Sequence, residues 1–295
     1  MPDPQTIDYM AKRDPGFSHF IGALDCTVAV HNAPMAVVQA LLPPNLQVKS
    51  SPTAPEGTSP ICVAYVRTDP SNWTLLPMVE VRVRAVALMV FNVYIGDMRR
   101  GHPGPYTYVS RWWSAPDWKV RLGSRLWGVP PSQGTVEAGQ ANLMSRVAVP
   151  GCVSLQTRDH GDIPEWPKVK QLAMQMQAPL LAKRPNGQLT VAGMNWNLAD
   201  ADMRSCELTM TLEPGVVAGA GLPGGPLSCT MDGTRDMAVG GTFRFGSICH
   251  LTHAGSPERD WSEWKAGPRF RLRADLSAIE VGPVAEKMRA AQLDS

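Results

Sequence analysis

The sequence has almost no net charge and no long hydrophobic run. Its 295 residues carry a formal net charge of +2, and no stretch approaches the roughly 18 consecutive apolar residues of a membrane-spanning helix. We therefore expect neither nucleic acid nor a membrane as a partner. The first residues, "MPDPQTIDYMAKRDPG", lack the apolar segment of a secretory signal. We expect a cytoplasmic protein whose residues 1–17 form a loosely ordered arm.

Paired cysteines and local nucleophile motifs are also missing. The chain has no C-x-x-C pair, no G-x-S-x-G and no phosphate-binding loop. Its six cysteines are far apart, and we expect buried free thiols in a reducing compartment: Cys26, Cys62, Cys152, Cys206, Cys229 and Cys249. His250 and His253 would point to opposite faces of a strand, so no metal site and no cofactor are expected.

Turn-forming residues are abundant. The chain has 26 glycines and 27 prolines, while 44% of its residues are hydrophobic. Short apolar runs separated by glycine or proline predict one β-rich domain over residues 1–295, with roughly a dozen strands. A sheet of that size is expected to close or to split into two packed sheets. Helices are expected at 35–42, where Pro43 and Pro44 stop the pattern, within 165–181 and at 283–293.

The most regular segment is "VEVRVRAVALMVFNVYI" (79–95). It alternates strictly at its start, which predicts a single strand with valines on one face and Glu80, Arg82 and Arg84 on the other. Such a charged face is either solvated or lines a polar pocket. The run continues with apolar residues on both faces, which is typical of a central strand and favours the pocket.

Four stretches resemble the acetoacetate decarboxylase family. They are "VVQALLPPNLQV" (37–48), "SPICVAYVR" leading to "VEVRVRA", "GPYTYVSRWW" (104–113) and the loop "GSRLWGVPP" (123–131). The resemblance covers roughly residues 20–135. It implies an α+β fold in which a closed or double β-sheet barrel encloses a cavity, with two or three peripheral helices. It also implies a small-molecule substrate and a homo-oligomer.

The departures from that family fall on its chemistry. The family's lysine, which forms a Schiff base with a β-keto acid, aligns with Pro131, and the lysine beside it aligns with Ser132. A further site carboxylate aligns with Tyr65, whereas the family's catalytic glutamate is retained as Glu80. Proline has no side-chain amine, so a covalent imine cannot form at this position. Lys119, on the segment that enters the loop, is the one stand-in we consider.

The remaining residues suit acid–base and electrostatic catalysis. Glu80 would move a proton, and Arg82 and Arg125 would stabilise an enolate or a carboxylate. The expected substrate-binding residues are Tyr65, Arg84, Tyr108, Arg111, Trp113, Trp127 and Pro131.

Our leading hypothesis is a non-covalent lyase, isomerase or cyclase that acts on a polyketide-like or β-dicarbonyl small molecule in secondary metabolism. Two alternatives stay open. One is a β-keto acid decarboxylase that uses a different residue, and the other is a non-catalytic small-molecule-binding protein.

Overall fold

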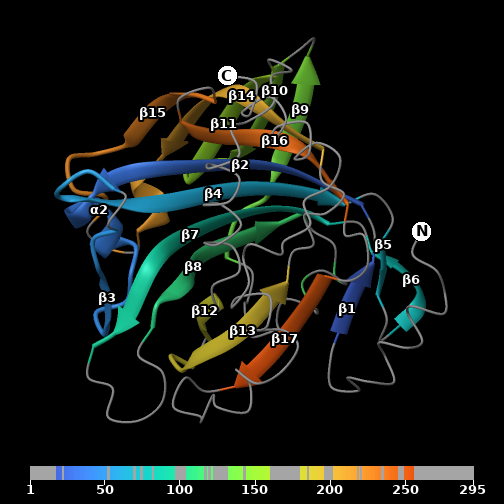
Figure 1. The fold of residues 1–295 in the computed structure, drawn as a ribbon, viewed down its shortest axis with the longest axis horizontal. Helices are drawn as coiled ribbons and strands as arrows, with labels where there is room; N and C mark the ends of the chain where they lie inside the picture. The colour runs from blue at the N-terminus through green and yellow to red at the C-terminus, as the bar shows by residue number, and fades with distance from the viewer. Residues whose placement is uncertain are drawn as a thin grey trace, which may run out of the picture.

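The structure is a computed structural model, and Figure 1 shows its fold. It describes residues 18–21, 23–51, 54–68, 71–73, 76–81, 83–96, 104–115, 118, 121, 132–141, 144–159, 180–184, 186–195, 202–217, 219, 221–233, 236–244 and 249–255.

Strands dominate these residues, which confirms the β-rich prediction. The strands are β1 (Ser18–Ile21), β2 (Ala23–Pro34), β3 (Leu46–Val48), β4 (Thr58–Thr68), β5 (Ser71–Trp73), β6 (Leu76–Val81), β7 (Arg84–Ile95), β8 (Tyr106–Ser114), β9 (Glu137–Ala141), β10 (Met144–Val149), β11 (Val153–Asp159), β12 (Leu180–Lys183), β13 (Leu189–Asn195), β14 (Asp202–Leu212), β15 (Leu227–Asp232), β16 (Met237–Arg244) and β17 (Cys249–Gly255). The helical elements with both bounds in the described residues are one short α-helix, α2 (Met35–Ala40), and one 3₁₀ turn, Pro214–Val216.

The strands form two sheets that share β14. The larger sheet runs β14-β16-β2-β4-β7-β8-β12-β13-β17-β1-β5-β6, with β3 added beside β7, and the smaller runs β9-β10-β11-β14-β15. All pairs are antiparallel except β12 with β8. In Figure 1 the larger sheet curves, so that β13 and β17 lie below β7 and β8.

The double-sheet form of the predicted architecture is confirmed, and the closed barrel is not. Closure would need the two ends of the larger sheet, β6 and β14, to pair with each other, and the described pairings contain no such ladder. Instead β14 leaves the larger sheet after Ser205 and continues between β11 and β15 in the smaller one. The larger sheet therefore ends by branching into a second sheet instead of closing on itself.

The single strand expected over 79–95 is wrong. β6 ends at Val81 and pairs with β5, whereas β7 begins at Arg84 and pairs with β4 and β8. The alternating pattern continues through this break. Alternation determines to which face each side chain points, but it does not determine with which strand a segment pairs. Glu80 and Arg84 consequently belong to different strand pairs.

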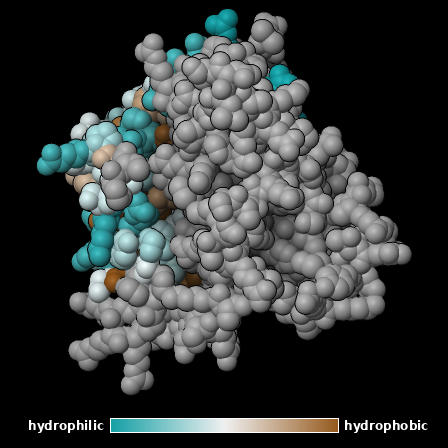
Figure 2. All heavy atoms as spheres, in the orientation of Figure 1, coloured by the Kyte–Doolittle hydropathy of each residue, from teal (hydrophilic) through white to brown (hydrophobic). Residues whose placement is uncertain are grey.

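The helix predicted at 35–42 is confirmed as α2, which ends two residues earlier, at Ala40, before Pro43 and Pro44. Val37 and Val38 are buried in the core, and the surface near α2 and β3 in Figure 2 is mostly hydrophilic, with small hydrophobic areas. The helix expected within 165–181 lies outside the described residues, except that Leu180 already begins β12. The arm 1–17 and the helix 283–293 also lie outside them. No helix in the described part of the chain is long and apolar enough to cross a membrane.

Candidate functional site

The central strands of the larger sheet, β2, β4, β7 and β8, have two buried faces of different character. Directly opposite residues of antiparallel strands share a face, and successive residues alternate between faces. The first face, here called the core face, carries Ala29, Val63, Leu88 and, further along β8, Trp113. These residues belong to one hydrophobic cluster together with the smaller sheet and α2. The core face is therefore packed between the two sheets.

The opposite face, here called the small-residue face, is made of two cross-strand rows and their neighbours. One row runs Cys26, Val66, Ala85 and Ser114, and the next runs Val28, Ala64, Ala87 and Trp112. All except Trp112 are at most 8% exposed, yet none belongs to the hydrophobic cluster. This face is buried by something other than the described core.

Two polar groups on the small-residue face have no hydrogen-bond partner. The Ser114 hydroxyl and the Trp112 indole nitrogen are both buried, and neither has a donor or acceptor within reach among the described residues. Buried polar groups are nearly always paired, so each exception needs a physical explanation. Both exceptions lie on one face of β8, two residues apart.

The segment that leaves the 123–131 loop is fixed to the same strand. Ser132 is the first described residue after that loop. Its backbone N–H donates to the backbone carbonyl of Trp112 at 2.6 Å. Its hydroxyl accepts from the backbone N–H of Trp112 at 3.3 Å. Ser132 is also the position that aligns with the family's second lysine. The chain directly after the loop is thus anchored beside the two unpartnered groups.

Gly134 fixes this segment from the other side. Its φ is +125°, and a Cβ there would lie 2.8 Å from Cγ1 of Val149 and 3.1 Å from Cδ1 of Trp113. Only glycine fits this close approach without strain. The returning chain is therefore held between Trp113 on the core face and β10 of the smaller sheet.

Five of the predicted substrate-binding residues are described, and all lie on the core face: Tyr65, Arg84, Tyr108, Arg111 and Trp113. Tyr108 and Trp113 are members of the hydrophobic cluster and are 4% and 1% exposed. Burial raises the pKa of Tyr108 to about 12, partly opposed by the Arg111 charge. Arg111 is half-buried and donates to the carbonyl of Ser110 at 2.8 Å.

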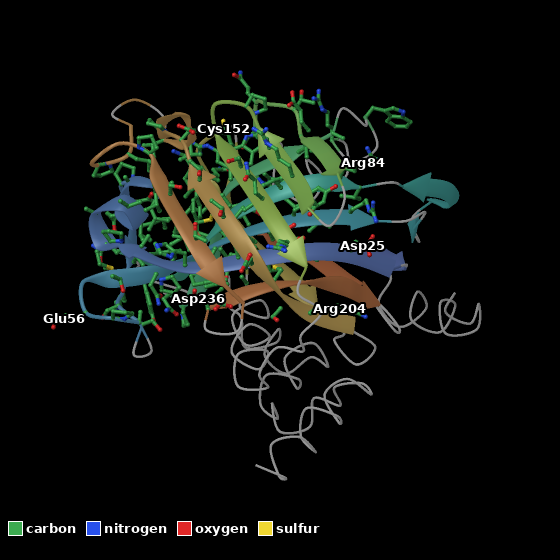
Figure 3. All side chains as sticks on the ribbon, turned by 90° about the horizontal axis from the view of Figure 1, so that it is seen from above. Asp25, Glu56, Arg84, Cys152, Arg204 and Asp236 are labelled. Carbon is green, nitrogen blue, oxygen red and sulfur yellow. The ribbon has the colours of Figure 1, made fainter. Side chains whose placement is uncertain are left out.

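Tyr65 and Arg84 lie with two further charged residues at the end of the central strands. Asp25 accepts from Nε and Nη2 of Arg67 at 3.1 and 2.5 Å, and Arg84 is the cross-strand partner of Arg67. Figure 3 shows Asp25 and Arg84 at the same end of the sheet. Burial raises the pKa of the Tyr65 phenol, while the Arg67 and Arg84 charges lower it. This end of the core face is consequently polar and half-exposed.

The side chains of the other predicted site residues are not described. Glu80 lies on β6 opposite Asn72, and only its backbone is described. Arg82, Arg125, Trp127, Pro131 and the stand-in Lys119 lie outside the described residues.

Sequence reasoning missed Ser114. The alternation of 106–114 places Ser114 and Trp112 on one side of β8, but no sequence pattern marks a hydroxyl as unpartnered.

The described residues contain no cluster of three or more His, Cys, Asp or Glu side chains placed to hold a metal ion.

No protein-family model and no curated protein matches the chain. Solved structures resemble it at low identity. The acetoacetate decarboxylase of Legionella pneumophila subsp. pneumophila str. Philadelphia 1 has 12% identity over 79% of this chain and 87% of that chain, with a TM-score of 0.45. An acetoacetate decarboxylase-like enzyme from Sphingomonas wittichii RW1 has 14% identity over 82% and 94%, with a TM-score of 0.47.

A third solved structure, of the enduracididine biosynthesis enzyme MppR, has 13% identity over 82% of this chain and 90% of that chain, with a TM-score of 0.47. Two of these solved structures carry the name of the family that the four sequence stretches resemble. At such identities and TM-scores this is a likeness of overall fold and no more.

Proposed function

We propose that the chain is a small-molecule enzyme of the lyase or isomerase type that works without a Schiff-base lysine. Its substrate would be a β-dicarbonyl or polyketide-like compound. The observation that carries the proposal is the anchoring of Ser132 to Trp112. It supports a site in which the chain directly after the loop is bonded to β8 although the lysine position holds Pro131.

In the proposed reaction Glu80 takes a proton from the carbon between two carbonyl groups. Arg82 and Arg125 stabilise the enolate that forms, because a guanidinium near a developing oxyanion lowers the barrier. Arg84 is exposed at the end of the central strands, so it suits an acidic or polar part of the substrate that extends beyond this end. Trp127 and Pro131 would form the wall of the site that the loop contributes.

The sharpest test is Glu80→Gln with turnover measured on a panel of β-diketones and β-keto acids. Loss of a positioned general base is expected to lower the rate about 100- to 10,000-fold. Glu56→Gln is the matched control, because Glu56 is exposed in a turn at the end of the sheet opposite Arg84 (Figure 3). Unchanged turnover in Glu80→Gln would remove Glu80 from the mechanism.

Borohydride reduction in the presence of each compound separates this proposal from a lysine mechanism. No covalent adduct is expected. A trapped adduct on Lys119, together with release of CO₂, would instead establish a decarboxylase that uses another lysine. Tight binding without any turnover across the panel would identify a binding protein.

A further inference from the structure

The indole N–H of Trp112 and the hydroxyl of Ser114 form a pair of unused donors. They project from the same face of β8 at positions two apart, so their Cα atoms are roughly 7 Å from each other. A buried hydrogen-bonding group without a partner costs about 1–3 kcal/mol. Two such groups on one face therefore destabilise the folded chain. A ligand that accepts a hydrogen bond from each of them would remove this destabilisation.

The neighbours of this pair have small side chains. Ala85 lies opposite Ser114, Ala87 lies opposite Trp112, and Ala64 follows in the same row. A methyl side chain rises little above the sheet, whereas the core face carries leucine, valine and tryptophan at the matching positions. The small-residue face thus allows another group to approach the sheet closely.

The same face is weakly polar. No charged side chain occurs in its rows on the four central strands as far as the structure describes them. Burial raises the pKa of the Cys26 and Cys62 thiols, both of which lie on this face. An environment that disfavours a thiolate also disfavours a carboxylate, because both lose their hydration.

We infer that Trp112 and Ser114 donate hydrogen bonds to uncharged carbonyl oxygen atoms of a ligand that lies on the small-residue face. The indole N–H can only donate, so the ligand must present an acceptor to it. This inference rests on the proposed function in placing the ligand beside the loop, and it narrows the substrate class. The buried part of the substrate is a ketone or diketone and not the carboxylate of a β-keto acid.

The test compares two probes of nearly equal shape. Benzoylacetone is an uncharged β-diketone, and benzoylacetate carries a carboxylate where the diketone has a methyl ketone. Binding of each to the full chain is measured at neutral pH by calorimetric titration or by ligand-observed NMR. We expect the unmodified chain to bind benzoylacetone at least about tenfold more tightly than benzoylacetate.

The variants Ser114→Ala and Trp112→Phe each remove one donor and keep most of the side chain. Each is expected to weaken benzoylacetone binding about two- to tenfold. Ser59→Ala is the matched control. The Ser59 hydroxyl is also buried and unpartnered, but it lies opposite Ala33 on the core face. Ser59→Ala should leave the affinity unchanged.

Stability gives a second readout. Ser114→Ala removes an unpartnered buried hydroxyl, so the free energy of unfolding of the ligand-free chain should stay the same or rise, as in Ser59→Ala. A clear fall would mean that the hydroxyl has a protein partner in solution, and this would overturn the inference. Tighter binding of benzoylacetate, equal binding of the two probes, or binding of neither at millimolar concentration would overturn it as well.

The inference and the proposed function fail in different ways. If both donor variants weaken benzoylacetone binding while Glu80→Gln changes no turnover, the carbonyl site stands and the catalytic proposal fails. If Glu80→Gln abolishes turnover while both donor variants bind benzoylacetone like the unmodified chain, the inference fails and the catalytic proposal stands.

Discussion

The core face and the small-residue face belong to the same four strands, and both are buried, yet they are built differently. On the core face Val63, Leu88 and Trp113 join a continuous cluster with the smaller sheet. On the small-residue face alanines take the matching positions, and two donors stay without partners. Burial alone therefore does not identify a packed core.

This difference suggests a division of labour within one sheet. Well-packed side chains fix the strands from one side, which holds the residues of the other side in defined positions. The segment after the loop is held on both sides as well, because Ser132 bonds to β8 while Gly134 lies close to Trp113.

The largest expected effect is the loss of packing on the core face. Trp113 is 1% exposed and belongs to the cluster, so Trp113→Ala should lower the free energy of unfolding by about 3–5 kcal/mol. Trp112→Ala, one residue earlier and on the other face, should cost clearly less, because Trp112 is only half-buried. Urea denaturation measures both variants. Equal losses would show that the two faces are packed alike.

A smaller effect is expected at the joint between the loop exit and the core. Gly134→Ala places a Cβ in a strained backbone conformation and against Val149, so it should cost about 1–3 kcal/mol. Gly139→Ala is the control, since a Cβ there meets no atom within 4 Å. Thermal unfolding compares the two. If Gly134→Ala matched its control, the segment after the loop would not be held by Trp113.

Much of this fold could be predicted from local patterns. The turn-rich, apolar sequence predicted a β-rich chain, and the prolines at 43 and 44 predicted that the helix beginning at Met35 ends before them. Each of these depends on residues that are neighbours in sequence, where alternation and turn chemistry act directly.

The break at residues 82–83 and the use of the two faces could not be predicted in this way. Arg84 continues the alternation of Glu80, yet it pairs with Arg67 of β4, while Glu80 pairs with Asn72 of β5. Pairing partners are set by long-range contacts. Likewise, Ser114 becomes notable only because no partner surrounds it, and its own sequence context gives no signal of that.

The weak polarity of the small-residue face has a consequence for pH dependence. Burial raises the pKa of Cys62 from 9.0 to about 12, so the folded state disfavours the thiolate. The resulting stability is fully present below pH 9 and is lost as the pH rises towards 12. Between pH 8 and pH 10 this one group should cost about 1 kcal/mol of the free energy of unfolding.

The measurement is the difference in urea stability between pH 8 and pH 10. Cys62→Ala should make the loss smaller than in the unmodified chain. Cys152→Ala is the control, because Cys152 is half-exposed and the nearby Arg111 charge opposes the rise in its pKa. A loss that is identical in Cys62→Ala and the unmodified chain would mean that water reaches this face.

The smallest effect is expected at the charged end of the core face. The Asp25–Arg67 ion pair is partly exposed, with side-chain exposures of 34% and 50%. Asp25→Asn should therefore lower the free energy of unfolding by only about 0.2–1 kcal/mol, and added salt should reduce the difference. The Arg84 guanidinium makes no ion pair within the described residues, so Arg84→Gln should leave stability unchanged. It should lower the affinity only for a substrate whose acidic group extends beyond the buried part, past the end of the strands. A loss of stability in Arg84→Gln as large as in Asp25→Asn would assign this arginine to the fold and would leave the substrate without its proposed cation.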